Sequence, residues 1–245
     1  MRGLGQMIVT EFRLFLREPS ATFFTLAFPL ILLFTFGSAF GNDPDPELGG
    51  WGAVDNSVMG YFGLVIGTVA LMSIPVTIAS YRQYGILKRL RATPVSAAQI
   101  VLAQIVVNGV LTAIGTILLV VAGKIFYDLR MPEMPWQLVL AWLVSYFSFA
   151  TFGFLLGGMS ATSRSAQAIG SAIYFPQIFL SGASFPRQLL PDWLQRVTEY
   201  FPMTQIYNLV TGLWHGDGWD WTALISLTAI GVISAVLSFR FFRWE

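Results

Sequence analysis

The most concentrated group of charged side chains in this 245-residue chain lies in the stretch Tyr81–Ser96, YRQYGILKRLRATPVS. Arg82, Lys88, Arg89 and Arg91 place four positive charges within ten residues, none of which is acidic. Such a cluster is unusual in a chain of which only 11% of the residues are charged. Positive charge of this density either orients a membrane protein or forms a docking surface for a soluble partner. The segment alone leaves both functions open.

The residue types that are missing exclude much catalytic chemistry. The chain has no cysteine and a single histidine, His215, which excludes disulfides, thiolate zinc sites, a cysteine nucleophile and metal sites built from several histidines. No phosphate-binding G-x-x-x-x-G-K-[ST] motif occurs, because Gly123-Lys124 is followed by Ile125. We therefore expect no metal ion, no cofactor and no nucleotide hydrolysis in this chain itself.

A serine hydrolase acting within the membrane is an alternative that the sequence supports poorly. Ser181 and Ser184 flank Gly182, but no G-x-S-x-G motif occurs, and His215 lies outside the long apolar runs. Small polar residues of this kind more often serve helix packing in membranes.

The composition predicts an integral membrane protein. Hydrophobic residues make up 55% of the chain and the mean hydropathy is +0.66, whereas about a quarter of the residues in a soluble domain are charged. A net charge of +1 gives no reason to expect a nucleic-acid partner. Six runs without a formal charge approach or exceed the roughly 18 residues of a transmembrane helix. They are Ala21–Phe40, Val58–Tyr81, Ala92–Gly123, Met134–Ser163, Ser165–Phe185 and Trp221–Phe239.

We therefore expect an all-α integral membrane fold in which residues 20–245 form a domain of six transmembrane helices. The expected spans are residues 21–40, 58–80, 97–123, 136–159, 165–184 and 221–239. Pro176 and Gln177 lie at mid-depth in the fifth span, so this span is expected to be broken or kinked.

Two further helical elements are expected outside the spans. Residues 1–19 predict an amphipathic helix in the membrane interface, because an apolar face and an arginine-bearing face alternate at helical spacing before Pro19. Residues 185–220 contain two apolar periodic pieces interrupted by Pro191 and Pro202. This segment is expected to form a short helical hairpin on the outer face, between spans five and six.

The distribution of charge predicts the orientation. With six spans, one side of the membrane carries ten of the fourteen basic residues and only three acids, Glu11, Glu18 and Glu245. The other side carries four basic residues and ten acids. The positive-inside rule then places both termini in the cytoplasm of a multi-pass protein of the cell membrane.

The six runs contain no formally charged residue, which indicates that any driving force enters from outside the spans. Their amide side chains include Gln99, Gln104, Asn108, Gln167 and Gln177. The candidates for a substrate pathway are Asn108, Tyr174 and Gln177. Pairing with a neighbouring helix is the competing, more frequent role of a polar residue in a span.

Two motifs resemble those of permease subunits of type-2 ATP-binding-cassette exporters, especially the daunorubicin-resistance permease group. The first is RQYGILKRLRATPVS at residues 82–96, which is similar to the family's basic segment ending in LRATP. The second is FPQIFLSGASFPRQLLPDWLQRVTEYFPMTQ at residues 175–205. The resemblance extends over essentially the whole chain. Gln83 stands where an acid is common in the family, and Gln104 stands where a lysine is often found.

The resemblance implies a subunit that moves a hydrophobic or amphipathic substrate outward, such as a drug, a lipid or a lipid-linked molecule. ATP and Mg²⁺ would bind a separate nucleotide-binding ATPase subunit, and a second permease copy or paralogue would complete the passage within membrane lipid. The residues carried over as ATPase-coupling candidates are Arg82, Gly85, Lys88, Arg89, Leu90, Glu11, Arg13 and Arg17. The alternative is an ATP-independent membrane scaffold or immunity protein.

Overall fold

The computed structural model describes residues 5, 9–10, 12–13, 22–86, 97–182 and 191–241. Within these ranges the secondary structure is helical, apart from an isolated bridge between Asp45 and Trp51. The elements are η1 (Phe23–Ala27), α3 (Phe28–Phe40), η2 (Pro46–Leu48), α4 (Ala53–Gly67), η3 (Thr68–Ser73), α5 (Ile74–Gln83), α7 (Ala97–Tyr127), α8 (Pro135–Met159), α9 (Ser163–Leu180), α10 (Asp192–Thr198), α11 (Pro202–His215) and α12 (Trp221–Phe241). The all-helical architecture agrees with the expected fold class.

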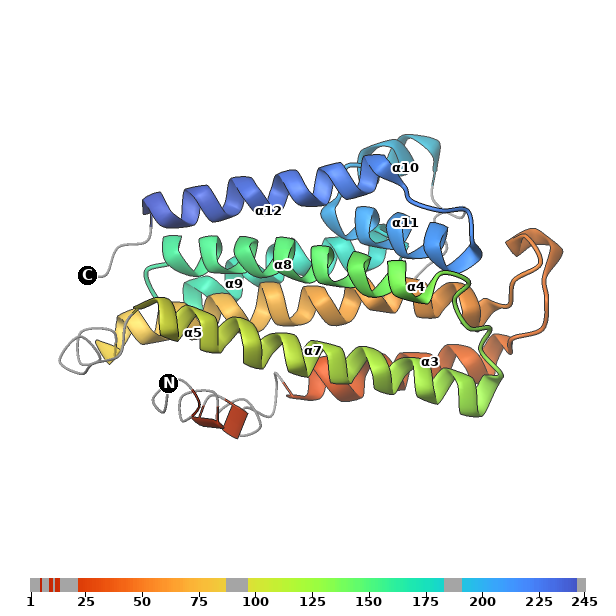
Figure 1. The fold of residues 1–245 in the computed structure, drawn as a ribbon, viewed down its shortest axis with the longest axis horizontal. Coiled ribbons are helices and arrows are strands. Elements are labelled where there is room, and N and C mark those ends of the chain that lie inside the picture. Colours follow the sequence, from red (N-terminus) through yellow and green to blue (C-terminus); the bar gives the residue numbers. More distant parts are fainter. Residues whose placement is uncertain are drawn as a thin grey trace.

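Among the described residues, five helical stretches are long and apolar enough to cross a bilayer, as expected of an integral membrane protein. They are Phe23–Phe40, Ala53–Gln83, Gln99–Tyr127, Pro135–Met159 and Trp221–Ser238. In Figure 1 the long helices lie roughly parallel in one bundle, and the direction of the chain alternates from one to the next. The short helices α10 and α11 lie towards the end of the bundle at which α12 begins.

The expected fifth span, residues 165–184, corresponds to the 18-residue helix α9, which is not among these five stretches. Its first turns carry Arg164, Ser165 and Gln167, so α9 is less apolar than the other long helices. Thr162 caps its first turn, because the Thr162 side chain accepts a hydrogen bond from the backbone N–H of Ser165 at 3.1 Å. The count of six spans therefore remains a prediction.

The second stretch, Ala53–Gln83, is the most buried of the five. In its most apolar window 83% of the residues are buried, compared with 22% for Phe23–Phe40 and 17% for Trp221–Ser238. A helix that is apolar on all sides belongs in the centre of a bundle. Its first part, α4, packs against α3, α7 and α11, and its later parts, η3 and α5, pack against α8 and α9.

This central stretch is interrupted in its middle by the π-helix η3, and Pro75 follows at the start of α5. Proline has no backbone N–H, so a carbonyl of the preceding turn lacks its helical donor. Glycines of the neighbouring helices approach the carbonyls of η3 closely. A Cβ atom on Gly153 would lie 2.1 Å from the Ala70 oxygen, and one on Gly170 would lie 2.0 Å from the Leu71 oxygen. Backbone therefore packs directly on backbone here.

The helices expected outside the spans are only partly described. Of residues 1–19, the described residues 5, 9–10 and 12–13 are helical, and Phe12 packs against Val107 and Leu111 of α7. After the central helices, Pro191 precedes α10 and Pro202 is the first residue of α11. The two prolines thus stand where two short helices begin.

Substituting Gly153 or Gly170 with alanine is expected to destabilise the protein, because the added methyl group collides with a backbone carbonyl that cannot move away. Overpacking of this kind costs about 2 kcal/mol. Gly123→Ala is the matched control, since the nearest atoms to its Cβ all belong to the Leu129 side chain. The midpoint of thermal unfolding in detergent measures the effect. Equal midpoints for all three variants would contradict the close backbone packing.

Candidate functional site

The end of α5 leads into the basic segment and carries two of the expected coupling residues. Arg82 lies in the last turn of α5, and Gly85 follows the C-cap residue Tyr84. Lys88, Arg89 and Leu90 lie outside the described residues, as do Glu11 and Arg17. Arg13 is exposed and, with Val9 and Phe12, lines a hollow of about 200 Å³ against Val106, Val107 and Val110 of α7.

Gly85 ends α5 by its backbone conformation. Its φ of +64° lies in the left-handed region, and its N–H donates to the Arg82 carbonyl at 3.0 Å. No atom lies within 4 Å of a Cβ built on it, so the glycine is needed for its conformation and not for space. This residue therefore sets the direction in which the chain leaves α5.

Arg82 and Gln83 fasten the end of α5 to the connection between α8 and α9. The Arg82 guanidinium donates through Nη1 to the carbonyl of Gly158, in the last turn of α8, where a positive charge is favourable. The Gln83 side chain accepts through Oε1 from the backbone N–H of Ser163 at 3.0 Å and from the Ser163 hydroxyl at 3.1 Å. Ser163 is the first residue of α9.

Sequence reasoning noted Gln83 only as a departure from the family's usual acid. The structure shows that the amide oxygen of Gln83 accepts both bonds, a role that a carboxylate would also fill. No local pattern predicts this contact, since its partners are 80 residues apart in the chain.

Asn108, the first pathway candidate, belongs to a buried polar row along one face of α7. The row runs at spacings of four and consists of Gln104, Asn108, Thr112 and Thr116. Asn108 donates through Nδ2 to the carbonyl of Gln104 at 2.8 Å and to its side-chain oxygen at 3.0 Å. Its own side-chain oxygen, Oδ1, is buried with no hydrogen-bond partner among the described residues.

The row connects α7 to its neighbours at both ends. Gln104 donates to the Tyr81 hydroxyl of α5 at 3.3 Å, and the indole N–H of Trp142 donates to Thr116 at 3.2 Å. Sequence reasoning found the two amides but missed Thr112 and Thr116, although a scan for polar residues every four positions would have found them.

Tyr174 and Gln177, the other pathway candidates, lie apart from this row on α9. The Tyr174 hydroxyl is hydrogen-bonded to the Thr68 hydroxyl and donates to the Leu64 carbonyl at 3.2 Å. Gln177 accepts through Oε1 from the backbone N–H of Met203, near the start of α11, at 3.1 Å. These bonds join α9 to α4, η3 and α11. The structure thus brings Tyr174 and Gln177 together and leaves Asn108 on a separate helix.

A buried carboxylate that sequence reasoning counted only among the outer acids holds the opposite end of the bundle. Asp55 is fully buried in the first turn of α4. Its Oδ1 accepts from Asn42 Nδ2 and from the Arg130 backbone N–H, each at 3.0 Å. Its Oδ2 accepts from the Gly52 N–H at 3.2 Å and lies 3.9 Å from Arg130 Nε. A carboxylate at a helix N-terminus with these donors is well stabilised.

Aromatic contacts extend this cluster to His215. The Arg130 guanidinium lies over the Trp51 ring, 5.3 Å from its centroid, and Trp51 stacks on His215 with centroids 4.2 Å apart. Burial lowers the pKa of His215 below its ordinary value, while Asp217 and Asp55 oppose the shift. The imidazole is therefore expected to be neutral at pH 7.

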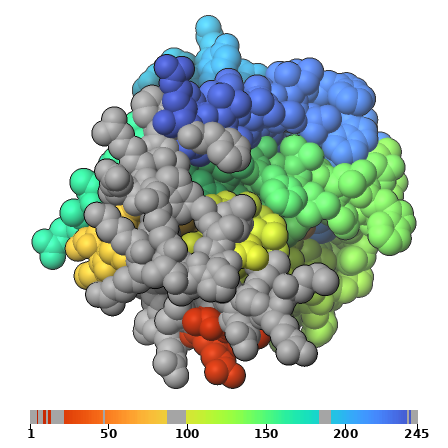
Figure 2. All heavy atoms as spheres, turned by 60° about the vertical axis from the view of Figure 1, so that its left-hand side comes forward, coloured from red at the N-terminus to blue at the C-terminus, as the bar shows by residue number. Residues whose placement is uncertain are grey.

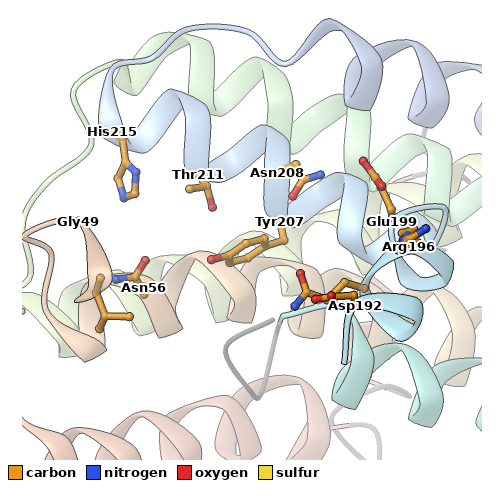
Figure 3. A pocket seen from close by; sticks show the side chains of 11 residues that line it. Gly49, Asn56, Asp192, Arg196, Glu199, Tyr207, Asn208, Thr211 and His215 are labelled. Carbon is orange, nitrogen blue, oxygen red and sulfur yellow. The ribbon is translucent and has the colours of Figure 1, made fainter. Parts of the chain in front are cut away.

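His215 also lines a polar cavity of about 770 Å³ between α4, α10, α11 and the loop before α4. Figure 3 shows side chains of α11 and α10 facing it from two directions. The lining residues are Leu48, Gly49, Asn56, Asp192, Gln195, Arg196, Glu199, Tyr207, Asn208, Thr211 and His215. Ser181, the nucleophile of the hydrolase alternative, is not among the described residues that line the cavity with His215.

Replacing Asp55 with alanine is expected to destabilise the protein by about 3 kcal/mol, because several buried N–H donors lose their acceptor. Asp43→Ala, an exposed acid of the same loop, serves as the control. Chemical unfolding in detergent compares the free energies of unfolding. A loss no larger than that of the control would show that Asp55 does not hold the loop to α4.

The lowered pKa of His215 predicts a loss of stability in acid. Above about pH 6.5 the group is neutral in both the folded and unfolded states, so its contribution is fully present. As the pH falls from about 6.5 towards the lower folded pKa, the unfolded state binds a proton first and stability decreases. His215→Phe keeps an aromatic ring beside Trp51 and is expected to reduce this decrease. Thermal unfolding at about pH 7.5 and about pH 5.5 measures it. The same decrease in both proteins would contradict the assignment.

Comparison with known proteins gives a match over most of the chain. The model of a family described as ABC-2 type transporter matches residues 2–213. YvfS of Bacillus subtilis, named as a transport permease, is 22% identical over 242 residues, which cover 97% of this chain and 96% of that protein. YhhJ of Escherichia coli K12, named an inner membrane transport permease, is 23% identical over 188 residues, or 72% of this chain and 50% of that protein. The permease ycf38 of Cyanophora paradoxa is 23% identical over 227 residues, or 88% and 76% of the two chains.

Proposed function

This chain belongs to the ABC-2 type transporter family, and we propose that it is the permease subunit of an ATP-driven exporter. The match over residues 2–213 carries the proposal. It is supported by the sequence, which has a basic segment between two spans but no phosphate-binding loop of its own. A separate ATPase subunit, with bound ATP and Mg²⁺, would then supply the energy.

The ATPase is proposed to dock at the end of the bundle where α5 leads into the basic segment. In Figure 2 the described residues at the end of α5, at the α8–α9 connection and at the end of α12 come forward on one side of the molecule. Arg164 and Arg240, both exposed, belong to this end. The ten basic residues that the sequence assigns to this side favour the cytoplasmic face.

In the proposed topology α9 is the fifth of six membrane-crossing helices. Its first residue bonds to Gln83 at the inner end of α5, and Gln177 bonds to Met203 at the start of α11. An 18-residue helix is about 27 Å long, which is close to the thickness of the hydrocarbon core. Both termini then lie in the cytoplasm and the acidic loops face outward.

The proposed substrate is hydrophobic or amphipathic and moves outward between this chain and a second permease, identical or homologous. The described outer surfaces of α7, α8 and α12 carry large exposed apolar side chains, including Ile117, Leu140 and Ile233. Such surfaces suit membrane lipid and an apolar cargo.

Reversing the charge of the basic segment is expected to disconnect the permease from its ATPase. The double variant Lys88→Glu, Arg89→Glu is co-expressed with the ATPase encoded beside the permease. Complex formation should fall about tenfold or more, because each charge pair with an acidic surface becomes repulsive. Co-purification and ATP-dependent efflux are the measurements.

Lys124→Glu is the control, since Lys124 lies at the opposite end of α7 and pairs with Asp128. If Lys88→Glu, Arg89→Glu leaves both the complex and efflux unchanged, the segment is not the docking surface. If the chain still protects cells from a toxic substrate when the catalytic carboxylate of the ATPase is removed, it acts as an ATP-independent scaffold instead.

A further inference from the structure

Two glutamine side chains form hydrogen bonds near the two ends of α9. One bonds to the first residue of α9, and the other lies near the end of α9 and bonds to α11. Gln83 of α5 accepts from the N–H and the hydroxyl of Ser163, where α9 starts. Gln177 of α9 accepts from the N–H of Met203, where α11 starts. The first N–H groups of a helix have no acceptor within their own helix, so an acceptor from another helix binds them directly. Each contact therefore joins the last turn of one helix to the first turn of another.

We infer that Gln83 is a positioning residue that transmits movement of the basic segment into α9, so that the end of α5 and the start of α9 move together. The inference rests on the proposed function, in which the ATPase acts on that segment. Movement of the basic segment would then reach the membrane domain through α9, in addition to the two helices that the segment directly connects.

The α8–α9 connection is short and is fixed by hydrogen bonds, so it is suited to transmit such a movement. Only Ser160–Thr162 separate the two helices. Thr162 and Ser165 cap each other, with the Thr162 N–H donating to the Ser165 hydroxyl at 3.1 Å. Arg82 holds the end of α8 through the Gly158 carbonyl. The end of α5 therefore contacts both the end of α8 and the start of α9, and the connection between them has little freedom to move on its own.

The central stretch has a place about which α5 can tilt. The π-helix η3 and Pro75 interrupt regular hydrogen bonding directly before α5. Gly153 and Gly170 face the carbonyls of Ala70 and Leu71 without a side chain between them. Helix backbones approach each other closely where they meet at glycines. In the inferred movement α5 tilts relative to α4 about this interruption.

Movement of α9 would reach the outer end through Gln177. Met203 is the second residue of α11, and Tyr207, Asn208, Thr211 and His215 of the same helix line the outer cavity. A shift of α9 along its axis therefore displaces the helix that forms one wall of this cavity.

The test uses the assembled transporter, with its ATPase, in lipid nanodiscs. The chain has no cysteine, so pairs of engineered cysteines can carry spin labels without background. One pair, Ile169→Cys with Leu118→Cys, reports α9 against α7, and both sites are exposed. The other pair, Tyr84→Cys with Leu102→Cys, reports the end of α5 and is also exposed. Distances are measured without nucleotide and after trapping with ATP and vanadate.

In the otherwise unsubstituted protein both distances are expected to change on trapping. In Gln83→Ala the change at the α9 pair should fall to less than half, while the change at the α5 pair persists. Gln83→Glu retains an acceptor for both donors and should restore the change. A purely structural role would not produce this split between the two pairs or its recovery by glutamate.

Ser163→Pro breaks the same contact from the other side if Gln83→Ala fails to fold. It removes both donors, and proline is favoured at the first position of a helix. The preceding Thr162, with φ −137° and ψ 158°, already has the extended conformation that precedes proline. The double variant should lose no more than either single variant.

Two results would overturn the inference. An α9 distance that changes fully in both Gln83→Ala and Ser163→Pro shows that movement reaches α9 by another route, and the proposed function stands. If neither distance changes on trapping in the unsubstituted complex, ATP does not drive this chain, and the proposed function fails together with the inference.

Discussion

The burial of the central stretch, Ala53–Gln83, is the constraint on which the rest of the structure depends. A helix of this length that is apolar on every side has to be surrounded by other helices, and α3, α7, α8, α9 and α11 surround it. Each end of the stretch then needs polar partners. At the end where α4 begins, the loop before α4 and the α7–α8 connector supply donors to Asp55. At the end of α5, Arg82 and Gln83 reach the α8–α9 connection.

Several polar contacts in this protein are made where helices begin. Asp55, Gln83 and Gln177 each provide an oxygen to backbone N–H groups at or just before a helix start, and these groups otherwise lack a partner. Away from such positions, glycines pack on backbone carbonyls, as at Gly153 and Gly170. Both amide pathway candidates are hydrogen-bonded, Asn108 within the polar row of α7 and Gln177 to the start of α11.

The sequence was sufficient to predict a helical membrane protein, because apolar runs longer than a bilayer is thick have few other structures available. It was less reliable at helix ends. The second uncharged run begins at Val58, yet α4 begins at Ala53, because a carboxylate is stable at a helix start when several donors meet it. The uncharged run predicted for the fifth span begins at Ser165, whereas α9 begins at Ser163 and includes Arg164 in its polar first turns. The Gln83–Ser163 contact could not be predicted, because nothing local to either residue marks the other as its partner.

The two ends of the bundle respond differently to their surroundings. The contact between the Gln83 amide and the N–H and hydroxyl of Ser163 involves no charged or titrating group. It is therefore independent of pH and only weakly affected by salt. At the opposite end His215, which binds a proton in acid, lies near the charge pair of Asp55 and Arg130. A change of acidity therefore acts on the end of the bundle that holds His215. The contact between Gln83 and Ser163 remains constant through the same change.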